Sequence, residues 1–118
     1  MQVDSISAVT LAVRDMARSV AFYRKLGLEL AYGGPGAAFT SFRCGTAFIN
    51  LAHDAGYEGP WWGRTILRVQ DVDAWYEHCL QQGLSPASPP RDAPWGERFF
   101  HLSDPDGHEL SFAELLAR

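Results

Sequence analysis

The chain repeats its own pattern after 56 residues, and this repeat constrains the fold more than any other feature. Each matched pair holds the same position in a strand–helix–strand unit: a strand residue under the helix, the N-cap, the C-cap or the first residue of the next strand. The pairs are Leu11/Leu67, Val13/Val69, Asp15/Asp71, Gly27/Gly83 and Leu28/Leu84. One constant spacing across all these positions is typical of an internal duplication. We therefore expect two copies of one unit.

The first copy predicts one helix and four strands. Asp15 stands at an N-cap position, apolar residues follow at helical spacing from Met16 to Leu26, and Gly27 ends the helix as a C′ glycine. Alternating residues rich in β-formers predict strands over residues 5–13, 28–32, 38–43 and 46–52.

The second copy predicts the same order of elements. Asp71 caps a helix that ends at Gly83, and its inward-facing residues are expected to be Val72, Trp75, Cys79 and Leu80. Strands are predicted over residues 64–69, 84–87, 99–103 and 108–115. The fold class is therefore α+β: tandem βαβββ modules over residues 1–53 and 63–118 form a curved mixed sheet with a cleft, and the helices lie outside.

Composition excludes several classes of function. The net charge of -4 and the absence of a basic stripe argue against nucleic-acid binding. No apolar run approaches the ~20 residues that span a bilayer, and no secretion signal precedes the first strand, so a membrane is not expected and the cytoplasm is. Cys44 and Cys79 lack a metal-binding spacing and are interpreted as reduced, partly buried thiols.

A hairpin near the end of the chain fixes which side chains share a face. Asp104, Pro105, Asp106 and Gly107 form a turn sequence between two apolar segments. Because side chains alternate along a strand, Glu109, Ser111 and Ala113 should share one face of the last strand. The same alternation places Arg64, Ile66 and Arg68 on the open face of their strand, and Phe48, Asn50 and Ala52 on that of another.

Several side chains are candidates for ligand binding. Arg64 and Arg68 are suited either to an anionic or carbonyl-bearing ligand or to internal pairing with Glu58, Glu97 or Glu109, and both alternatives remain open. Aromatic residues in predicted loops could form pocket walls or cover a dimer interface: Tyr57, Trp61, Trp62 and Trp95.

The histidines are expected to lie apart. His78 and His108 are predicted to be exposed, and His101 is expected in a strand among aromatic residues. A cluster of His53, His101 and Glu109 could in principle form a metal or acid–base site, but no ligand spacing supports one.

The segments VTLAVRDMARSVAFYRKLGL, RVQDVDAWYEHCLQQGL and DPDGHELSF resemble the vicinal-oxygen-chelate superfamily over essentially the whole chain. This superfamily includes glyoxalase I, bleomycin-resistance proteins, fosfomycin-resistance enzymes and extradiol dioxygenases. The resemblance implies a divalent metal held by four strand residues, at positions that correspond here to Ala8, Asn50, Arg64 and Ser111. None of these four is a usual ligand, so we expect no metal and no other cofactor.

The resulting prediction is metal-free binding of a small organic molecule, planar or anionic, as in the bleomycin-resistance branch, with no catalytic residue. The resemblance also implies a homodimer, with or without strand exchange. The alternative is a glyoxalase-type lyase or isomerase, or a dioxygenase, whose metal is displaced or absent. A third possibility is an open face that serves only as a dimer interface. The predicted ligand-binding residues are Asn50, Arg64, Arg68, Trp61, Trp62, Trp95, His101, Glu109 and Ser111.

Overall fold

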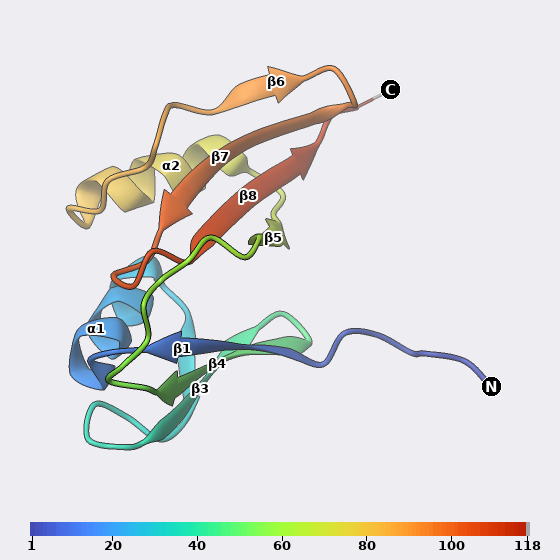
Figure 1. The fold of residues 1–118 in the computed structure, drawn as a ribbon. Helices are drawn as coiled ribbons and strands as arrows, with labels where there is room; N and C mark the ends of the chain where they lie inside the picture. Colours follow the sequence, from blue (N-terminus) through green and yellow to red (C-terminus); the bar gives the residue numbers. More distant parts are fainter. Residues whose placement is uncertain (118) are drawn as a thin grey trace. The chain divides into compact units, whose positions relative to one another are not determined.

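The computed structural model describes residues 1–117, which divide into two compact units (Figure 1). The first unit comprises Met1–Glu58, and the second begins at Gly59. Neither helix of the described residues is long and apolar enough to cross a membrane.

Both units have the same topology, as the repeat predicts. The first contains β1 (Ala8–Val13), α1 (Met16–Leu26), β2 (Glu29–Tyr32), β3 (Phe39–Cys44) and β4 (Ala47–His53). The second contains β5 (Arg64–Arg68), α2 (Val72–Gln81), β6 (Arg91–Ala93), β7 (Glu97–Ser103) and β8 (Glu109–Leu115). The strand orders are β1-β4-β3-β2 and β5-β8-β7-β6, and the first two strands of each sheet are parallel. The predicted α+β fold of βαβββ modules is confirmed.

The helices begin and end at the predicted residues. Asp15 Oδ1 accepts a hydrogen bond from the Arg18 amide at 3.1 Å, and Asp71 Oδ1 accepts one from the Ala74 amide at 3.0 Å. Gly27 ends α1 with φ 107°, and Gly83 follows α2 with φ 75°. These left-handed conformations explain why the sequence has glycine at both places.

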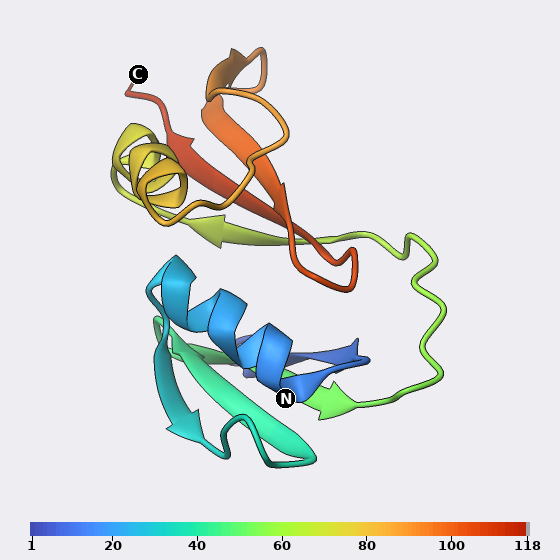
Figure 2. The ribbon, with the colours of Figure 1, turned by 90° about the vertical axis from the view of Figure 1, so that its left-hand side faces the viewer.

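Each helix packs its apolar side on one face of its own sheet, and Figure 2 shows α1 lying across the first sheet. In the first unit, Tyr23 of α1 is fully buried with its ring 5.7 Å from that of Phe42. In the second unit, the rings of Phe100 and Phe112 stack at 5.0 Å, and Trp75 of α2 stacks on Phe112 at 5.1 Å. These side chains form the centres of the two cores.

The inward side of α2 differs from the prediction at one position. Val72 and Cys79 are buried, but Leu80 is 46% exposed. Tyr76 takes the inward place instead, and its ring meets that of Phe100 edge to face with the ring centroids 5.6 Å apart. Cys79 is a free thiol, and burial raises its pKa to about 11.

The strand predicted over residues 84–87 does not form. In its place Arg91–Ala93 pairs with the beginning of β7. Pro86, Pro89 and Pro90 carry no amide hydrogen and cannot donate to a sheet ladder. Between Pro86 and Pro89 the described structure has one hydrogen bond of the ladder type, from the Ala87 amide to the His101 carbonyl at 2.9 Å. The regular ladder begins after the last proline.

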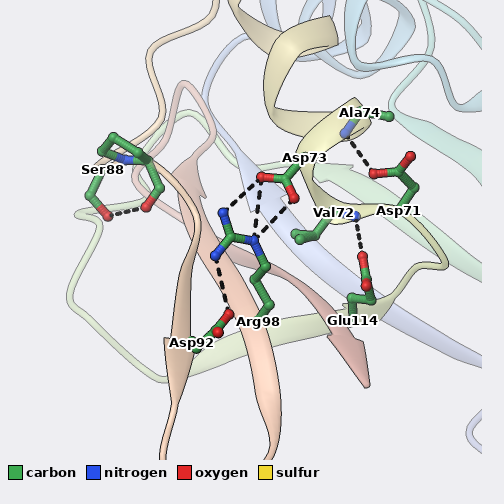
Figure 3. Close-up of polar contacts among 9 residues, drawn as sticks. Asp71, Val72, Asp73, Ala74, Ser88, Asp92, Arg98 and Glu114 are labelled. Atoms are coloured by element: carbon green, nitrogen blue, oxygen red, sulfur yellow. Dashed lines mark hydrogen bonds and ion pairs between the residues drawn. The ribbon is translucent and has the colours of Figure 1, made fainter. Parts of the chain in front are cut away.

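Carboxylates hold the start of α2 to its sheet (Figure 3). Glu114 of β8 accepts a hydrogen bond from the Val72 amide at 2.8 Å, and this contact satisfies one free amide of the first helical turn. Arg98 of β7 bonds Asp73 of α2 at 3.0 Å and Asp92 of β6 at 3.1 Å. The guanidinium therefore joins three elements on the helix-covered side of the sheet.

Candidate functional site

The turn between β7 and β8 has the geometry that its sequence predicts. Asp104 Oδ1 accepts hydrogen bonds at 2.9 Å from the amides of Asp106 and His108, and Gly107 has φ 88°. An aspartate that bonds the following backbone amides defines the turn and sets the register of the two strands. In that register, His101 pairs with Ser111 and Ser103 with Glu109.

The sheet face opposite α2 brings most of the predicted site residues together. We call this the arginine face. It carries alternate residues of all four strands: Arg64, Ile66 and Arg68 of β5, Glu109, Ser111 and Ala113 of β8, Glu97, Phe99 and His101 of β7, and Arg91 and Ala93 of β6. It therefore carries three arginines, two glutamates and one histidine.

Two of these arginines pair with glutamates of the same face. The Arg64 guanidinium bonds the Glu109 carboxylate on the neighbouring strand, and Arg68 lies 3.7 Å from Glu97. The internal pairing considered for these arginines is therefore present. Such partly exposed pairs contribute little to stability, and they leave the face close to neutral in this region.

An aromatic row runs along β7 beside these pairs. Trp95 in the β6–β7 turn stacks on Phe99 with ring centroids 5.9 Å apart, and Phe99 contacts His101 at 5.1 Å. The Trp95 indole also donates a hydrogen bond to Glu97 at 2.7 Å. Trp95 is 64% exposed, so its ring is available on the surface of the second unit.

His101 lies in the middle of the arginine face. Its Nδ1 atom is buried and has no hydrogen-bond partner within residues 1–117. Burial is the main cause that lowers the pKa of His101, Glu109 opposes this shift, and Arg64 and Arg91 add to it. The imidazole is therefore neutral at physiological pH.

We expect the His101 imidazole to titrate below the ordinary histidine pKa of about 6.5. Arg91→Gln should raise this midpoint, because it removes a nearby positive charge, and Glu109→Gln should lower it further. Two-dimensional NMR of the histidine ring signals measures the titration midpoint of His101 in the parent protein and in both variants. Stability should fall as the pH drops through 6.5, because the unfolded chain binds the proton that the folded state excludes. Identical midpoints in the three proteins would contradict this electrostatic arrangement.

Trp61 and Trp62 differ in their surroundings. Trp61 is 68% exposed, and the Arg64 guanidinium lies 5.8 Å from its ring centroid. Trp62 donates its indole hydrogen to Nδ1 of His108 at 2.8 Å. His108 is 3% exposed, so the prediction that it is exposed was wrong. The indole contact and the turn around Asp104 explain its burial. His78 is half-buried against Trp75, and is likewise not fully exposed.

The remaining predicted residue, Asn50, belongs to the first unit. Its side chain accepts a hydrogen bond from Ser41 at 2.7 Å and donates one to Thr10 at 3.3 Å. His53 ends β4 of that unit and lines an open hollow of about 450 Å³ beside the start of α1. Asp15, which caps that helix, also lines the hollow, so a carboxylate already occupies the position where a helix would attract an anion.

The donor groups do not suit the metal that the resemblance implies. Ala8 has no donor atom, and Asn50 is already bonded on both sides. Arg64 presents a permanent cation paired with Glu109, and the Ser111 hydroxyl is a weak, neutral ligand. Within residues 1–117, no group of three or more His, Cys, Asp or Glu is arranged to hold a metal ion. A metal centre at these positions therefore disagrees with the chemistry of the residues present.

Two residues of the arginine face were missed by sequence reasoning. Phe99 was assigned only to a strand, and Arg91 lay in a segment with no predicted element. The sequence does contain a signal for both, since the Pro94–Gly96 segment is typical of a hairpin turn that would pair Arg91 with Phe99. The neighbouring prolines concealed it, because they suggested a loop throughout.

Comparison with known proteins identifies the class of this duplicated βαβββ fold. The sequence of residues 5–112 matches the model of the Glyoxalase/Bleomycin resistance protein/Dioxygenase superfamily. The chain therefore belongs to that superfamily, as its resemblance implied. A search of curated protein sequences found no significant match.

Solved structures with the same fold include both binding proteins and an enzyme. The bleomycin resistance determinant of transposon Tn5 has a TM-score of 0.81 at 24% identity, over 94% of this chain and 98% of that one. A bleomycin-binding protein in complex with bleomycin has a TM-score of 0.78 at 24% identity, over 95% and 98% of the two chains. Lactoylglutathione lyase from Agrobacterium tumefaciens has a TM-score of 0.77 at 23% identity, over 97% and 96%. At these identities the likeness establishes the fold alone.

Proposed function

We propose that this protein binds a small organic molecule without a metal and that the arginine face forms part of the binding surface. The observation that carries the proposal is the replacement of all four expected ligands by Ala8, Asn50, Arg64 and Ser111. The bleomycin complex of a structural neighbour supports it, because this fold can hold an organic ligand. The proposed contacts in the second unit are Arg64, Arg68, Trp61, Trp62, Trp95, His101, Glu109 and Ser111. In the first unit, taken by itself, Asn50 is the proposed contact.

The side chains of the arginine face suit ligand recognition better than bond making. The Arg64–Glu109 and Arg68–Glu97 pairs present hydrogen-bonding groups whose charges are already compensated. The exposed Trp95 ring provides a rigid surface for stacking at a small entropic cost. Apolar surface with a few fixed polar groups is typical of sites that bind small molecules.

Metal-free bleomycin is the first probe for this proposal. We expect calorimetric titration of the untagged protein to give the same affinity with and without EDTA, and elemental analysis to find no stoichiometric divalent metal. Trp95→Leu should weaken binding about tenfold, because a stacked aromatic contact contributes on the order of 1–1.5 kcal/mol. Tyr32→Leu is the matched control, since Tyr32 is a comparably exposed ring (67%) on β2 of the first unit.

Other outcomes separate the alternatives. A stoichiometric metal whose removal abolishes binding would overturn the metal-free proposal. Interconversion of lactoylglutathione with glutathione and methylglyoxal in the presence of EDTA would favour a lyase of the glyoxalase type. If bleomycin and a broad panel of small organic molecules all fail to bind, small-molecule binding itself is wrong.

A further inference from the structure

The charges of the arginine face do not cancel. Arg64 and Arg68 are each paired with a glutamate, but Arg91 is paired with none. Within residues 1–117 its guanidinium makes no ion pair, and its Cζ atom lies 5.1 Å from the centroid of the Phe99 ring. This leaves one positive charge on the face that no carboxylate of the described residues neutralises.

The surroundings of His101 keep its imidazole neutral, so it adds no second positive charge beside Arg91. A proton on its buried Nδ1 would be a donor without an acceptor, which is costly away from water. The neutral tautomer with the proton on Nε2 avoids that cost. His101 can therefore donate a hydrogen bond to a ligand oxygen while it remains uncharged.

The rings beside Arg91 form an aromatic stack. Trp95 and Phe99 lie within 26° of parallel, and Phe99 connects this stack to both Arg91 and His101. Arg91 is exposed on β6, which is the last strand of its sheet. Its planar guanidinium has a fork of donors that matches a carboxylate.

From these three observations we propose that the preferred ligand of the arginine face is a planar aromatic monoanion. Its ring stacks on the exposed Trp95, its carboxylate or equivalent oxygens bind Arg91, and His101 donates a hydrogen bond to it. This inference rests on the proposed function and specifies the class of ligand.

A pair of isosteric probes tests the role of charge directly. 2-Naphthoate and 2-naphthamide have the same ring system and differ in one negative charge. Calorimetric titration at low salt should show that naphthoate binds about tenfold more tightly, since a charge-assisted contact is about twice as strong as a neutral one. The Trp95 indole NMR signal should shift with both probes, because both place a ring against it.

Arg91→Gln should remove the preference for naphthoate and leave the affinity for naphthamide within about twofold. Arg91→Lys should restore part of the preference, because it restores the charge without the planar fork. Arg24→Gln is the matched control: it removes one positive charge from an exposed residue of α1, in the first unit, and should leave the preference unchanged.

The outcomes distinguish this inference from the proposed function. Equal affinity for the two probes, or an equal loss of both in Arg91→Gln, would overturn selection for an anion and leave small-molecule binding intact. Failure of both probes would overturn the aromatic monoanion as ligand, whereas the proposed function is decided by the titrations with bleomycin and the broad panel.

Discussion

Replacing Phe112 by alanine is expected to lower the free energy of unfolding by about 4 kcal/mol. Phe112 is fully buried and stacks on two rings, with centroids 5.0 Å from Phe100 and 5.1 Å from Trp75. Its removal would leave a cavity between α2 and the sheet of the second unit. Urea denaturation followed by circular dichroism measures the effect as a lower midpoint.

Two further variants make this expectation falsifiable if Phe112→Ala does not fold. Phe112→Leu keeps most of the volume and should cost about 1–2 kcal/mol. Leu115→Ala is the control on the same strand, because Leu115 is 53% exposed, and should change stability by less than about 0.5 kcal/mol. A loss for Phe112→Leu no larger than that of the control would mean that this stack is not the core of the second unit.

Gly33→Ala is expected to lower the free energy of unfolding by about 2–4 kcal/mol, because strain and a lost hydrogen bond add. Gly33 has φ 79°, and an added Cβ would overlap the Phe39 carbonyl oxygen and lie 2.8 Å from Thr40 Oγ1. Thr40 is fully buried, and its hydroxyl bonds both the amide and the carbonyl of Gly34 at 3.1 Å. The backbone would have to shift, and these bonds would be disturbed.

Gly36→Ala is the matched control for this effect. It lies three residues further along the same loop, its φ is not positive, and an added Cβ has open space around it. Its thermal or urea midpoint should therefore stay close to that of the parent protein. If the two variants lose the same stability, the loop tolerates a side chain at Gly33 and the close approach to Thr40 does not constrain it.

The sequence predicted the fold well because its strongest signals are local and occur twice. Asp15 and Asp71 begin the helices, and Gly27 and Gly83 follow their ends, since each residue type satisfies a backbone requirement that depends only on its neighbours. The turn at Asp104 is local in the same sense. The prediction of a strand over residues 84–87 was wrong because three prolines in this segment interrupt the ladder. Where the ladder resumes depends on the alignment with β7, and that alignment is not a local property of the sequence.

The candidate site was predicted only in part, because its contacts depend on register across strands. Alternation along β5 correctly placed Arg64 and Arg68 on one face. Their glutamate partners were left open among three candidates, since pairing is set by the alignment of β5 with β8 and β7. Arg91 was overlooked because the prolines before β6 concealed the hairpin that pairs it with Phe99. The burial of His108 depends on Trp62, 46 residues away in the sequence, and no local pattern contains that contact.

The registers of the two sheets also record where the copies have diverged. Thr10 and Ile66 are 56 residues apart, whereas their partners Asn50 and Ser111 are 61 apart, so the second copy has gained five residues relative to the first. Four of these lie between the end of the helix and the third strand of the unit, because Gly27 and Gly83 still differ by 56 while Phe42 and Leu102 differ by 60. The lengthened segment includes Arg91 and Trp95. Both copies keep the parallel pairing of their first and last strands, although the connection from helix to second strand is much longer in the second copy, from Gln81 to Arg91 instead of from Leu26 to Glu29. The side chains proposed to select the ligand therefore lie where the two copies differ most in length.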